Sequence, residues 1–296
     1  MGTPLPFTAP RLEDADDIRT IVSACGGMNS DLSFAGIYLL QAKYNTEVAV
    51  EAGFLYRRYG NNTRLNGYAF PLSAGDCTPA LQRIVEDAAE RGEPLQFCLL
   101  TEEQSALLQR RFPGRFQEVV KRGDADYLYH RTDLAELPGT AYHKKRNHIS
   151  KFTRLHPDWS LKPLNADNVE DARGIAERWL AASESSPALQ HEFRAICHAL
   201  EMREALQLSG GVLYVDNAPA AMAVCSAISP QVVDIHYEKC APEWRDAYTL
   251  VNREVARLFS CTYINREEDL DQPGLRQAKE SYYPARMLNK ISLLPC

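Results

Sequence analysis

The stretch AVEAGFLYRR, residues 49–58, reads as two β-strands joined by a turn at Glu51-Ala52-Gly53. The stretch YVDNAPAAMAV, residues 214–224, has the same strand-turn-strand order around Asp216. One such hairpin therefore lies in each half of a chain of 296 residues. The pair is the first indication that the second half is a diverged copy of the first, and that the fold is built from a repeat.

Two further matches occur in the same order. Near the start of each half, DDIRTI (residues 16–21) resembles EDARGI (170–175). Later, Glu102-Glu103 precedes the sequence FPGR at 112–115, and Glu267-Glu268 precedes YPAR at 283–286. Three weak matches in one order carry more weight than any one of them. Because polar residues with catalytic chemistry are kept mainly in the second copy, we expect the first half to be scaffold and the second to hold the active cleft.

Composition indicates an ordinary globular protein. Hydrophobic residues make up 45% of the chain and charged residues 24%, and the net charge is −6. The longest apolar stretch, 218–228, is much shorter than the roughly 20 residues that cross a bilayer. The N-terminal sequence lacks the basic and apolar regions of a signal peptide, and the eight cysteines form no Cys-x-x-Cys pair. We therefore expect a cytoplasmic protein with reduced thiols and no transmembrane segment.

Hydrophobic periodicity predicts alternating helices and strands in both halves. In the first half we expect helices at 12–24, 79–91 and 102–111, and strands within 47–59 and at 66–72, 95–100, 116–120 and 126–130. In the second half we expect helices at 167–182, 192–207, 244–259 and 274–282, and strands at 211–215, 220–228, 232–238 and 262–265. Strands that dominate the middle of each half, with helices around them, indicate an α/β or α+β fold.

A basic segment, YHKKRNHISKFTRL at 142–155, lies between the two halves. Apolar residues at helical spacing would seat one side of a helix on a domain and turn the cations outward, where they would suit phosphate groups. A solvated linker helix explains the charge run equally well. The position of the cations in an otherwise acidic chain favours a binding role. The basic and histidine residues are His143, Lys144, Lys145, Arg146, His148, Lys151 and Arg154.

A second polar cluster follows the strand expected at 262–265. Its sequence, YINREED at 263–269, ends a buried strand in Asn265, Arg266, Glu267 and Glu268, and the following helix carries Lys279, Glu280, Tyr282 and Tyr283. Strand ends in α/β sheets display reacting groups, and a carboxylate there could act as a general base. Each acid taken alone is explained as well by helix capping and pairing with the arginine. Taken together, the residues favour a site.

The sequence HYEK at 236–239 ends another strand. His236 is more typical of a packed strand histidine than of a catalyst, whereas Glu238 lies at the expected mouth of the cleft. His191-Glu192 lacks the second histidine of a zinc motif. The chain also has no Gly-x-Ser-x-Gly elbow, no phosphate loop and no Gly-x-Gly-x-x-Gly fingerprint. These absences argue against metal, hydrolase and nucleotide-binding functions.

Three motifs, YHKKRNHISKF, HYEK and INREEDLDQPGLRQAKESYYPARMLNK, together resemble the phosphatidylglycerol lysyltransferase C-terminal-like family, which includes many proteins of unknown function. That family is similar to tandem GNAT acyltransferases and to Fem-type aminoacyl transferases. The resemblance implies two GNAT-like repeats, each a mixed, mostly antiparallel sheet flanked by helices. We expect an N-terminal domain at 1–135, a basic connecting helix at 136–158 and a C-terminal domain at 159–296 with the active cleft.

The resemblance also implies a transfer reaction. GNAT enzymes transfer an acyl group directly to an amine, whereas the Fem-type and lysyl-lipid relatives take an aminoacyl group from tRNA. GNAT enzymes that use coenzyme A carry glycines that cradle the pyrophosphate at the turn after the fourth strand. Here the corresponding stretch, 243–249, has no glycine and contains Asp246, and 73–77 in the first half is no better. Coenzyme A is thus disfavoured, and an aminoacyl-tRNA-like donor is preferred.

We therefore predict an aminoacyl or acyl transferase acting on an amine or hydroxyl acceptor. A phosphate-bearing ligand, either tRNA, an anionic lipid or a nucleotide, would bind at the basic helix. The alternatives are a coenzyme A-dependent N-acetyltransferase and a catalytically silent tandem GNAT that binds RNA, lipid or a protein partner. The predicted catalytic residues are Glu238, Glu267, Glu268, Tyr282 and Tyr283. The predicted substrate-binding residues are His143, Lys144, Lys145, Arg146, His148, Tyr237, Asn265, Arg266, Lys279 and Arg286.

Overall fold

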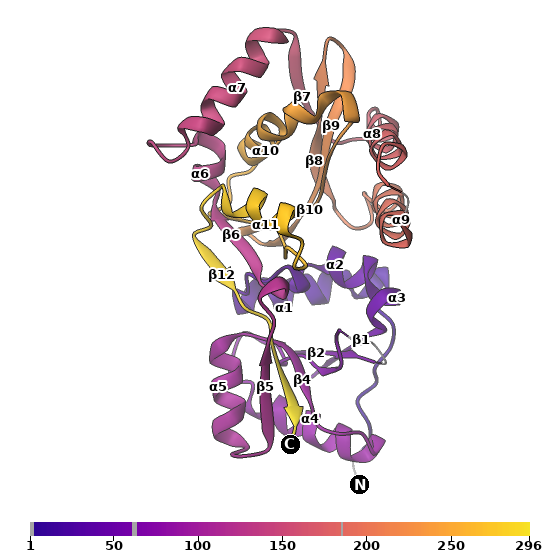
Figure 1. Cartoon of the computed structure of the whole chain (residues 1–296). Helices are drawn as coiled ribbons and strands as arrows, with labels where there is room; N and C mark the ends of the chain where they lie inside the picture. Colours follow the sequence, from indigo (N-terminus) through magenta and orange to yellow (C-terminus); the bar gives the residue numbers. More distant parts are fainter. Residues whose placement is uncertain (1–2, 61–63, 185) are drawn as a thin grey trace. The chain divides into compact units, whose positions relative to one another are not determined.

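The computed structural model describes residues 3–60, 64–184 and 186–296. The chain divides into two compact units, each built around a β-sheet (Figure 1). Unit 1 contains Met1–Tyr127 together with two later segments, Glu267–Gln277 and Arg286–Cys296. Unit 2 contains Leu128–Arg266 and Ala278–Ala285. The last part of the chain thus contributes to both units.

The sheet of unit 1 has the strand order β1-β2-β3-β4-β13-β5. Its pairs are antiparallel except for the parallel pair β3 and β4. The strands are β1 (Thr46–Glu51), β2 (Phe54–Tyr59), β3 (Gly67–Tyr68), β4 (Phe97–Leu100), β5 (Phe116–Val120) and β13 (Ile291–Pro295). The helices are α1 (Ala15–Cys25), α2 (Phe34–Leu39), α3 (Gln41–Tyr44), α4 (Thr78–Arg91) and α5 (Glu102–Arg111), with short 3-10 turns at Leu12–Asp14, Ser30–Leu32 and Arg122–Asp124. β12 (Arg286–Leu288) precedes β13.

Local sequence explains most of unit 1. The hairpin between β1 and β2 turns through Ala52 and Gly53, both with positive φ, as a tight hairpin turn requires. Helix α5 begins with a capping box, in which Thr101 and Gln104 exchange hydrogen bonds. Helix α4 turns an apolar side that includes Ile84 into the core. Sheet and helices thus bury one apolar core.

The sheet of unit 2 has the order β6-β11-β10-β9-β8-β7. Again one pair, β10 and β11, is parallel while the other printed pairings are antiparallel. The strands are β6 (Asp126–His130, in unit 2 from Leu128 on), β7 (Trp159–Pro163), β8 (Ser209–Val215), β9 (Ala218–Ser229), β10 (Val232–Cys240) and β11 (Tyr263–Asn265). The helices are α6 (Arg131–Glu136), α7 (His143–Leu155), α8 (Val169–Ala181), α9 (Pro187–Glu201), the 3-10 turn Pro242–Ala247, α10 (Tyr248–Arg257) and the end of α11 (Pro273–Glu280).

Helices cover the strands of unit 2 on two sides (Figure 1). Helices α8 and α9 pack on one side of β8 and β9 through a core that includes Ile175, Ile196 and Met222. Helix α10 packs against the same sheet and against α6 and α7. The hairpin between β8 and β9 turns through Asp216 and Asn217, again with positive φ at both positions. The two hairpins that first indicated a repeat therefore have the same turn geometry, one in each unit.

The prediction of an α/β fold with two mixed, mostly antiparallel sheets flanked by helices is confirmed. The units nevertheless divide the chain differently from the expected boundaries at 135 and 159, because 267–277 and 286–296 join unit 1. The physical reason is β13, which inserts between β4 and β5, pairs with both and buries Leu293 completely. Local periodicity carries no information about such long-range pairing.

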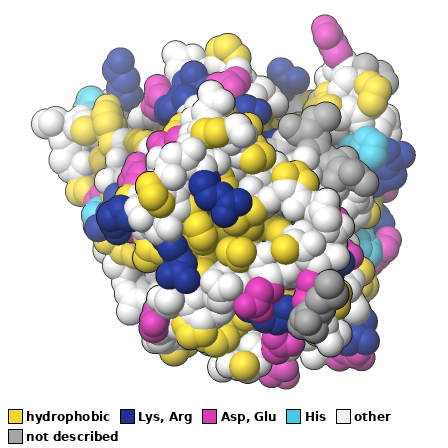
Figure 2. All heavy atoms as spheres, turned by 90° about the horizontal axis from the view of Figure 1, so that it is seen from below, with side chains coloured by type: hydrophobic (Ala, Val, Ile, Leu, Met, Phe, Trp, Pro, Cys, Tyr) yellow, Lys and Arg dark blue, Asp and Glu magenta, His cyan; other side chains and the backbone are white. Residues whose placement is uncertain are grey.

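The surface has no large purely apolar face in the view of Figure 2. Hydrophobic side chains gather near the centre of that face, and lysine or arginine side chains lie within and beside them. Among the described residues no helix has both the length and the apolar character needed to cross a membrane. None of the eight cysteines, all of which are described, forms a disulfide.

Candidate functional site

The predicted site residues are divided between the two units. Glu267, Glu268 and Arg286 belong to unit 1. The other predicted residues belong to unit 2, and several of them converge on one carboxylate. The predicted residues of unit 2 are His143, Lys144, Lys145, Arg146, His148, Tyr237, Glu238, Asn265, Arg266, Lys279, Tyr282 and Tyr283.

In unit 2 the convergence point is Glu238, which lies on β10 with only 10% of its side chain exposed. Arg266, directly after β11, donates from Nη2 to Glu238 Oε1 at 3.2 Å. Asn252 on α10 donates from Nδ2 to Glu238 Oε2 at 3.0 Å. Parallel strands run in one direction, so β10 and β11 place these polar groups toward the same end of the sheet, where α/β proteins often bind ligands.

Two atoms of this arrangement are buried and have no hydrogen-bond partner. They are Arg266 Nη1, a donor, and Asn252 Oδ1, an acceptor. Buried polar atoms in native proteins are nearly always paired, so an unpaired donor and acceptor on either side of one carboxylate indicate a place for a polar ligand. Burial lowers the pKa of Arg266, but Glu238, Tyr129 and Tyr282 together raise it above its ordinary value, so the guanidinium stays charged.

Lys145 and Tyr282 border the same cluster. Lys145 Nζ donates to Ser281 Oγ at 2.7 Å and lies 3.8 Å from the centre of the Tyr282 ring. Burial and the nearby charge of Arg266 lower the pKa of Lys145 to about 8, although Glu238 opposes this shift. Burial raises the pKa of Tyr282 to about 12, so its hydroxyl keeps its proton at neutral pH. The Arg266 guanidinium also lies 5.1 Å from the Tyr282 ring.

Helix α7 forms at the predicted basic segment and has the predicted two-sided character. Ile149 and Phe152 are buried. Arg146 donates to the backbone oxygens of Leu137 and Gly139, and His148 Nε2 contacts Asp246 O at 3.0 Å. The exposed basic and histidine residues are His143, Lys144, His148, Lys151 and Arg154. Only Lys145 of this helix reaches the Glu238 cluster.

The remaining predicted residues of unit 2 have other positions. Lys279 is buried and donates from Nζ to Arg266 O at 2.6 Å, which fixes the backbone beside the cluster. Tyr283 is 54% exposed and its hydroxyl donates to Ala141 O at 3.4 Å. Asn265 is fully buried in β11, and Tyr237 packs against the apolar core under α8 and α9. These contacts give Lys279 and Asn265 supporting positions.

Sequence reasoning missed two features of unit 2. It missed Asn252, because an asparagine in an amphipathic helix carries no signal of its own. It treated His236 as a packed strand residue, and the histidine is indeed 95% buried at its side chain. However, His236 Nε2 lies 2.8 Å from Ser226 Oγ, and Nδ1 lies 3.4 Å from Asp234 Oδ2. The sequence did contain a signal for the contact between Asp234 and His236. They lie two residues apart on one strand, and side chains at that spacing face the same side of a strand.

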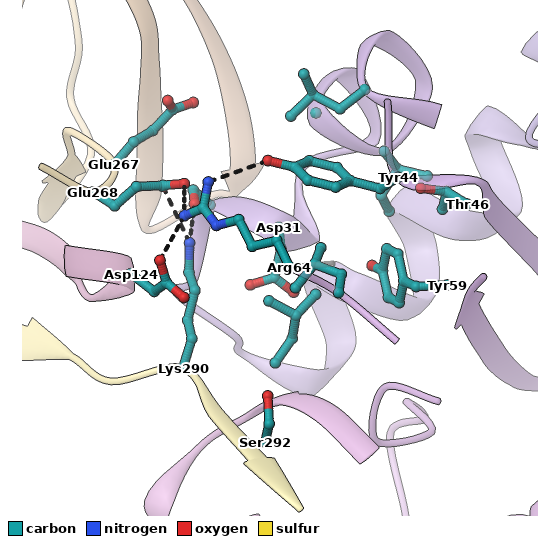
Figure 3. Close-up of a pocket in the computed structure, with 16 residues that line it drawn as sticks. Asp31, Tyr44, Thr46, Tyr59, Arg64, Asp124, Glu267, Glu268, Lys290 and Ser292 are labelled. Atoms are coloured by element: carbon teal, nitrogen blue, oxygen red, sulfur yellow. Dashed lines mark hydrogen bonds and ion pairs between the residues drawn. The ribbon is translucent and has the colours of Figure 1, made fainter. Parts of the chain in front are cut away.

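Unit 1 contains a small charged cavity of about 90 Å³ (Figure 3). Glu268 is at its centre: Oε1 accepts from Arg64 Nη2 at 2.8 Å, and Oε2 accepts from Lys290 Nζ at 3.3 Å. Arg64 also pairs with Asp124 at 2.9 Å, and Lys290 pairs with the buried Asp126 at 2.6 Å. Figure 3 shows the carboxylate of Glu267, which also lines the cavity, directed away from this group.

The surroundings of Glu268 make it a poor general base. Burial alone would raise the pKa of this carboxyl. The charges of Lys290 and Arg64 have the opposite effect, and the resulting pKa is about 2. A general base is most effective when its pKa lies near the working pH. The geometry instead gives Glu268 a structural role as the counter-ion of two cations. Nothing in the sequence around Arg64 or Lys290 indicated that they would pair with it.

A second cavity in unit 1, of about 600 Å³, is lined in part by Arg286. It extends along the end of α1, the loop after β3, the start of α5 and the segment 286–289.

Comparisons with known proteins place the chain in a family. The family described as "Phosphatidylglycerol lysyltransferase, C-terminal" matches residues 26–292, and the chain belongs to it. The resemblance inferred from the three sequence motifs is thereby confirmed. A crystal structure of a conserved protein of unknown function from Bacteroides thetaiotaomicron is 32% identical, with a TM-score of 0.92, and the match covers 99% of this chain and 100% of that one.

More distant matches show the fold alone. The structure of L-PGS from Bacillus licheniformis is 13% identical with a TM-score of 0.66, over 95% of this chain and 91% of that one. The C-terminal domain (DUF2156) of the "Putative Lysylphosphatidylglycerol Synthetase" from Agrobacterium fabrum gives 14% identity and a TM-score of 0.65 over the same shares of the two chains. An uncharacterised protein of Mycoplasmoides gallisepticum is 22% identical over 179 residues, 58% of this chain and 57% of that protein's own length.

Proposed function

We propose that this protein is an acyltransferase that moves an acyl group, in the first place an aminoacyl group, from an activated ester to an amine or hydroxyl acceptor. The observation that carries the proposal is the buried Glu238 of unit 2, held between Arg266 and Asn252, with an unpaired donor and an unpaired acceptor beside it. Membership of the phosphatidylglycerol lysyltransferase C-terminal family supports the same reaction class.

The cluster has the groups that acyl transfer requires. The acceptor nitrogen or oxygen attacks the ester carbonyl carbon, and Glu238 takes the proton that the acceptor loses. Arg266 and Lys145 lie where they can stabilise the negative charge that develops on the carbonyl oxygen. The carbon–oxygen bond to the leaving group then breaks, and Tyr282, which is protonated at neutral pH, gives its proton to the leaving oxygen. Proton transfer from Glu238 through solvent restores Tyr282.

The charge of the region fits a phosphate-bearing donor. The two basic side chains Arg266 and Lys145 outnumber the single carboxylate of Glu238. Helix α7 adds three exposed cations, Lys144, Lys151 and Arg154. A polyanionic donor such as an aminoacyl-tRNA would be attracted to such a surface. The turn at Pro242–Ala247, where coenzyme A enzymes of this fold class would need glycines, instead exposes Glu243 and Asp246. This disfavours coenzyme A as the donor.

A silent binding protein is the less favoured function. Such a protein would be expected to leave its candidate carboxylates fully exposed. Glu238 is only 10% exposed and is held by two hydrogen bonds. Burying a charged carboxylate among partners has a desolvation cost, which is more readily understood at a working site.

The test is a transfer assay with the purified full-length chain. Radiolabelled aminoacyl-tRNAs are supplied as donor, and either vesicles containing phosphatidylglycerol or the soluble amine glycinamide as acceptor. We expect label in an acceptor product, no transfer from acetyl-coenzyme A, and a rate lowered roughly 100-fold by Glu238→Gln. The matched control is Glu177→Gln on the exposed side of α8, which should keep the full rate.

Two results would contradict the proposal. One is the absence of product with every aminoacyl-tRNA and both acceptors. The other is an unchanged rate in Glu238→Gln, with thermal unfolding used to verify that each variant is folded. Transfer from acetyl-coenzyme A alone would instead support the N-acetyltransferase alternative.

A further inference from the structure

The larger cavity of unit 1 has features of a ligand site that the proposed transfer reaction does not use. We propose that it binds an apolar acyl chain that ends in an amide group. All of the cavity's lining residues belong to unit 1, whereas Glu238, Arg266 and Lys145 belong to unit 2. Ligand binding in this cavity is therefore independent of the proposed transfer function.

The cavity has a suitable size and an apolar wall. Its volume of about 600 Å³ lies within the range of roughly 300–1,000 Å³ that small-molecule sites occupy. Much of the wall is contributed by hydrophobic side chains, among them Leu32, Phe70, Leu72, Met287 and Leu288. An alkyl chain gains free energy by burying its surface against such side chains.

Three polar atoms without partners belong to residues that line the same cavity. They are Nδ2 of Asn29, Nε of Arg57 and Oδ1 of Asp31, and none has a hydrogen-bond partner in the structure. Asn29 is 7% exposed and Arg57 only 2%. A buried polar group left unpaired costs about 1–3 kcal/mol, so three in one wall require an explanation. A ligand that pairs with them would supply one.

The chemistry of these atoms selects the polar end of the ligand. Asn29 and Arg57 offer N–H donors, which suit a carbonyl oxygen, while Asp31 offers an acceptor, which suits an N–H group. An amide has both groups. Three carboxylates, those of Asp31, Glu102 and Glu103, line the cavity together with two guanidinium groups, those of Arg57 and Arg286, so a carboxylate ligand would meet a net negative lining. This is why an amide fits better than an acid.

Backbone geometry at the cavity points the same way. Leu99 on β4 has a φ of 57°, in the left-handed region that residues other than glycine rarely adopt. It lines this cavity, and the register of the pair β4 and β13 shifts beside it. Strained backbone of this kind clusters at ligand sites.

The cavity's own cysteines allow a direct test. Cys25 and Cys77 line it, whereas Cys296 is exposed elsewhere in unit 1 and Cys197 lies in unit 2. The full chain is alkylated with iodoacetamide at pH 8.5, with or without octanamide, and the rate at each cysteine is followed by mass spectrometry. Octanamide is expected to slow alkylation of Cys25 and Cys77 severalfold and to leave Cys197 and Cys296 unchanged. Octanoate is expected to protect them less.

A substitution separates binding from folding. Asn29→Leu keeps the approximate size of the side chain and removes the unpaired donor. We expect it to weaken protection by octanamide about tenfold, the order expected for one buried hydrogen bond. Because Nδ2 has no partner in the protein, the variant should be as stable as the wild type or more stable. The control is Asn168→Leu, at a buried asparagine whose amide is paired with Pro163 and Asn165, and this variant should lose stability.

The possible results all decide the question. Protection confined to Cys25 and Cys77, and lost in Asn29→Leu, supports the proposal. No protection by octanamide, equal protection of all four cysteines, or stronger protection by octanoate than by octanamide would each overturn it. So would full protection retained in a folded Asn29→Leu protein.

Discussion

Glu268 shows how a buried carboxylate can tie stability to pH. It accepts from Arg64 and Lys290, and Lys290 is shared with Asp126. Its pKa is about 2 in the folded chain, against an ordinary value of 4.5. A carboxyl whose pKa is lower in the folded state stabilises that state above its ordinary pKa. The contribution is lost as pH falls through the window from about 4.5 to 2.

Replacing this carboxyl should therefore have two effects. We expect Glu268→Gln to lower the free energy of unfolding at pH 7 by about 3 kcal/mol, because the buried Lys290 and the partly buried Arg64 each lose one of two carboxylate partners. We also expect the difference between variant and wild type to shrink between pH 4.5 and pH 2. Urea unfolding at several pH values measures both effects. Glu103→Gln, at an exposed carboxylate on α5, is the control. An equal loss of stability at all pH values would contradict the ion-pair explanation.

Lys145 should differ chemically from its neighbour Lys144. Burial and the charge of Arg266 lower its pKa to about 8, so a large share of the amine is unprotonated at mildly alkaline pH. We expect acetic anhydride labelling of Lys145 to rise through a midpoint near pH 8. Glu238→Gln should move this midpoint lower, because Glu238 raises the pKa of Lys145. Peptide mass spectrometry with competing labels measures the profile. The exposed Lys144 provides an internal control, and identical profiles at both lysines would exclude the buried-amine interpretation.

At the level of elements, α7 is the segment whose charge is most readily tested. Lys145 is partly buried and bonded to Ser281, so reversing its charge would disturb packing as well as binding. Lys144 and Lys151 are exposed and provide a cleaner test. We expect Lys144→Glu with Lys151→Glu to weaken binding of tRNA or of anionic vesicles and to reduce its salt dependence.

The control for the double substitution in α7 is a variant with the same change of net charge in another helix. Arg110 and Arg111 are exposed in the last turn of α5, and Arg110→Glu with Arg111→Glu changes the net charge equally. Binding to tRNA and to vesicles is measured by gel shift and by sedimentation. Equal weakening in both double variants would show that only net charge matters and that α7 is not a specific binding surface.

Elements with strong local signals were predicted well from the sequence. Helix α5 has the expected bounds, 102–111, because its capping box and its Pro-Gly break are both local. Helix α9 begins at Pro187 and not at 192, because Ser186 caps it ahead of its apolar residues. The expected helix at 244–259 is a 3-10 turn followed by α10 at 248–257. The short helices α2 and α3 and the strands β7, β12 and β13 were not predicted, since their patterns are too short to show a period.

Prediction of the site was limited by the same locality. Glu238, Arg266 and Tyr282 are among the predicted site residues, because all three stand at or just beyond element ends in unit 2. Asn252, Arg64 and Lys290 were not, since their roles come from partners distant in sequence. The cavities of unit 1 also could not be predicted, because a void is defined by packing and not by spacing. The first half accordingly contains two cavities that its expected role as scaffold did not predict.

At the scale of the whole molecule, β13 links the end of the chain to the first unit. Leu293 is fully buried in the core of unit 1, while its neighbour Leu294 is 37% exposed. We expect Leu293→Ala to lower the free energy of unfolding by about 3 kcal/mol, the usual cost of a large-to-small change in a core. Leu294→Ala should cost less than about 1 kcal/mol. Thermal or urea unfolding compares the pair, and similar costs at both positions would contradict the inserted position of β13.

The position of β13 has a consequence during synthesis. Strands β4 and β5 leave the ribosome long before residues 291–295, which must come between them. Until residues 291–295 have been synthesised, these two strands lack the neighbour that completes the sheet, and unpaired strand edges favour association with other chains. Synthesis of unit 1 therefore begins before that of unit 2 and is completed after it. A ribosome that stalls before residue 291 would hold a nascent chain whose first unit is still open to chaperones and proteases.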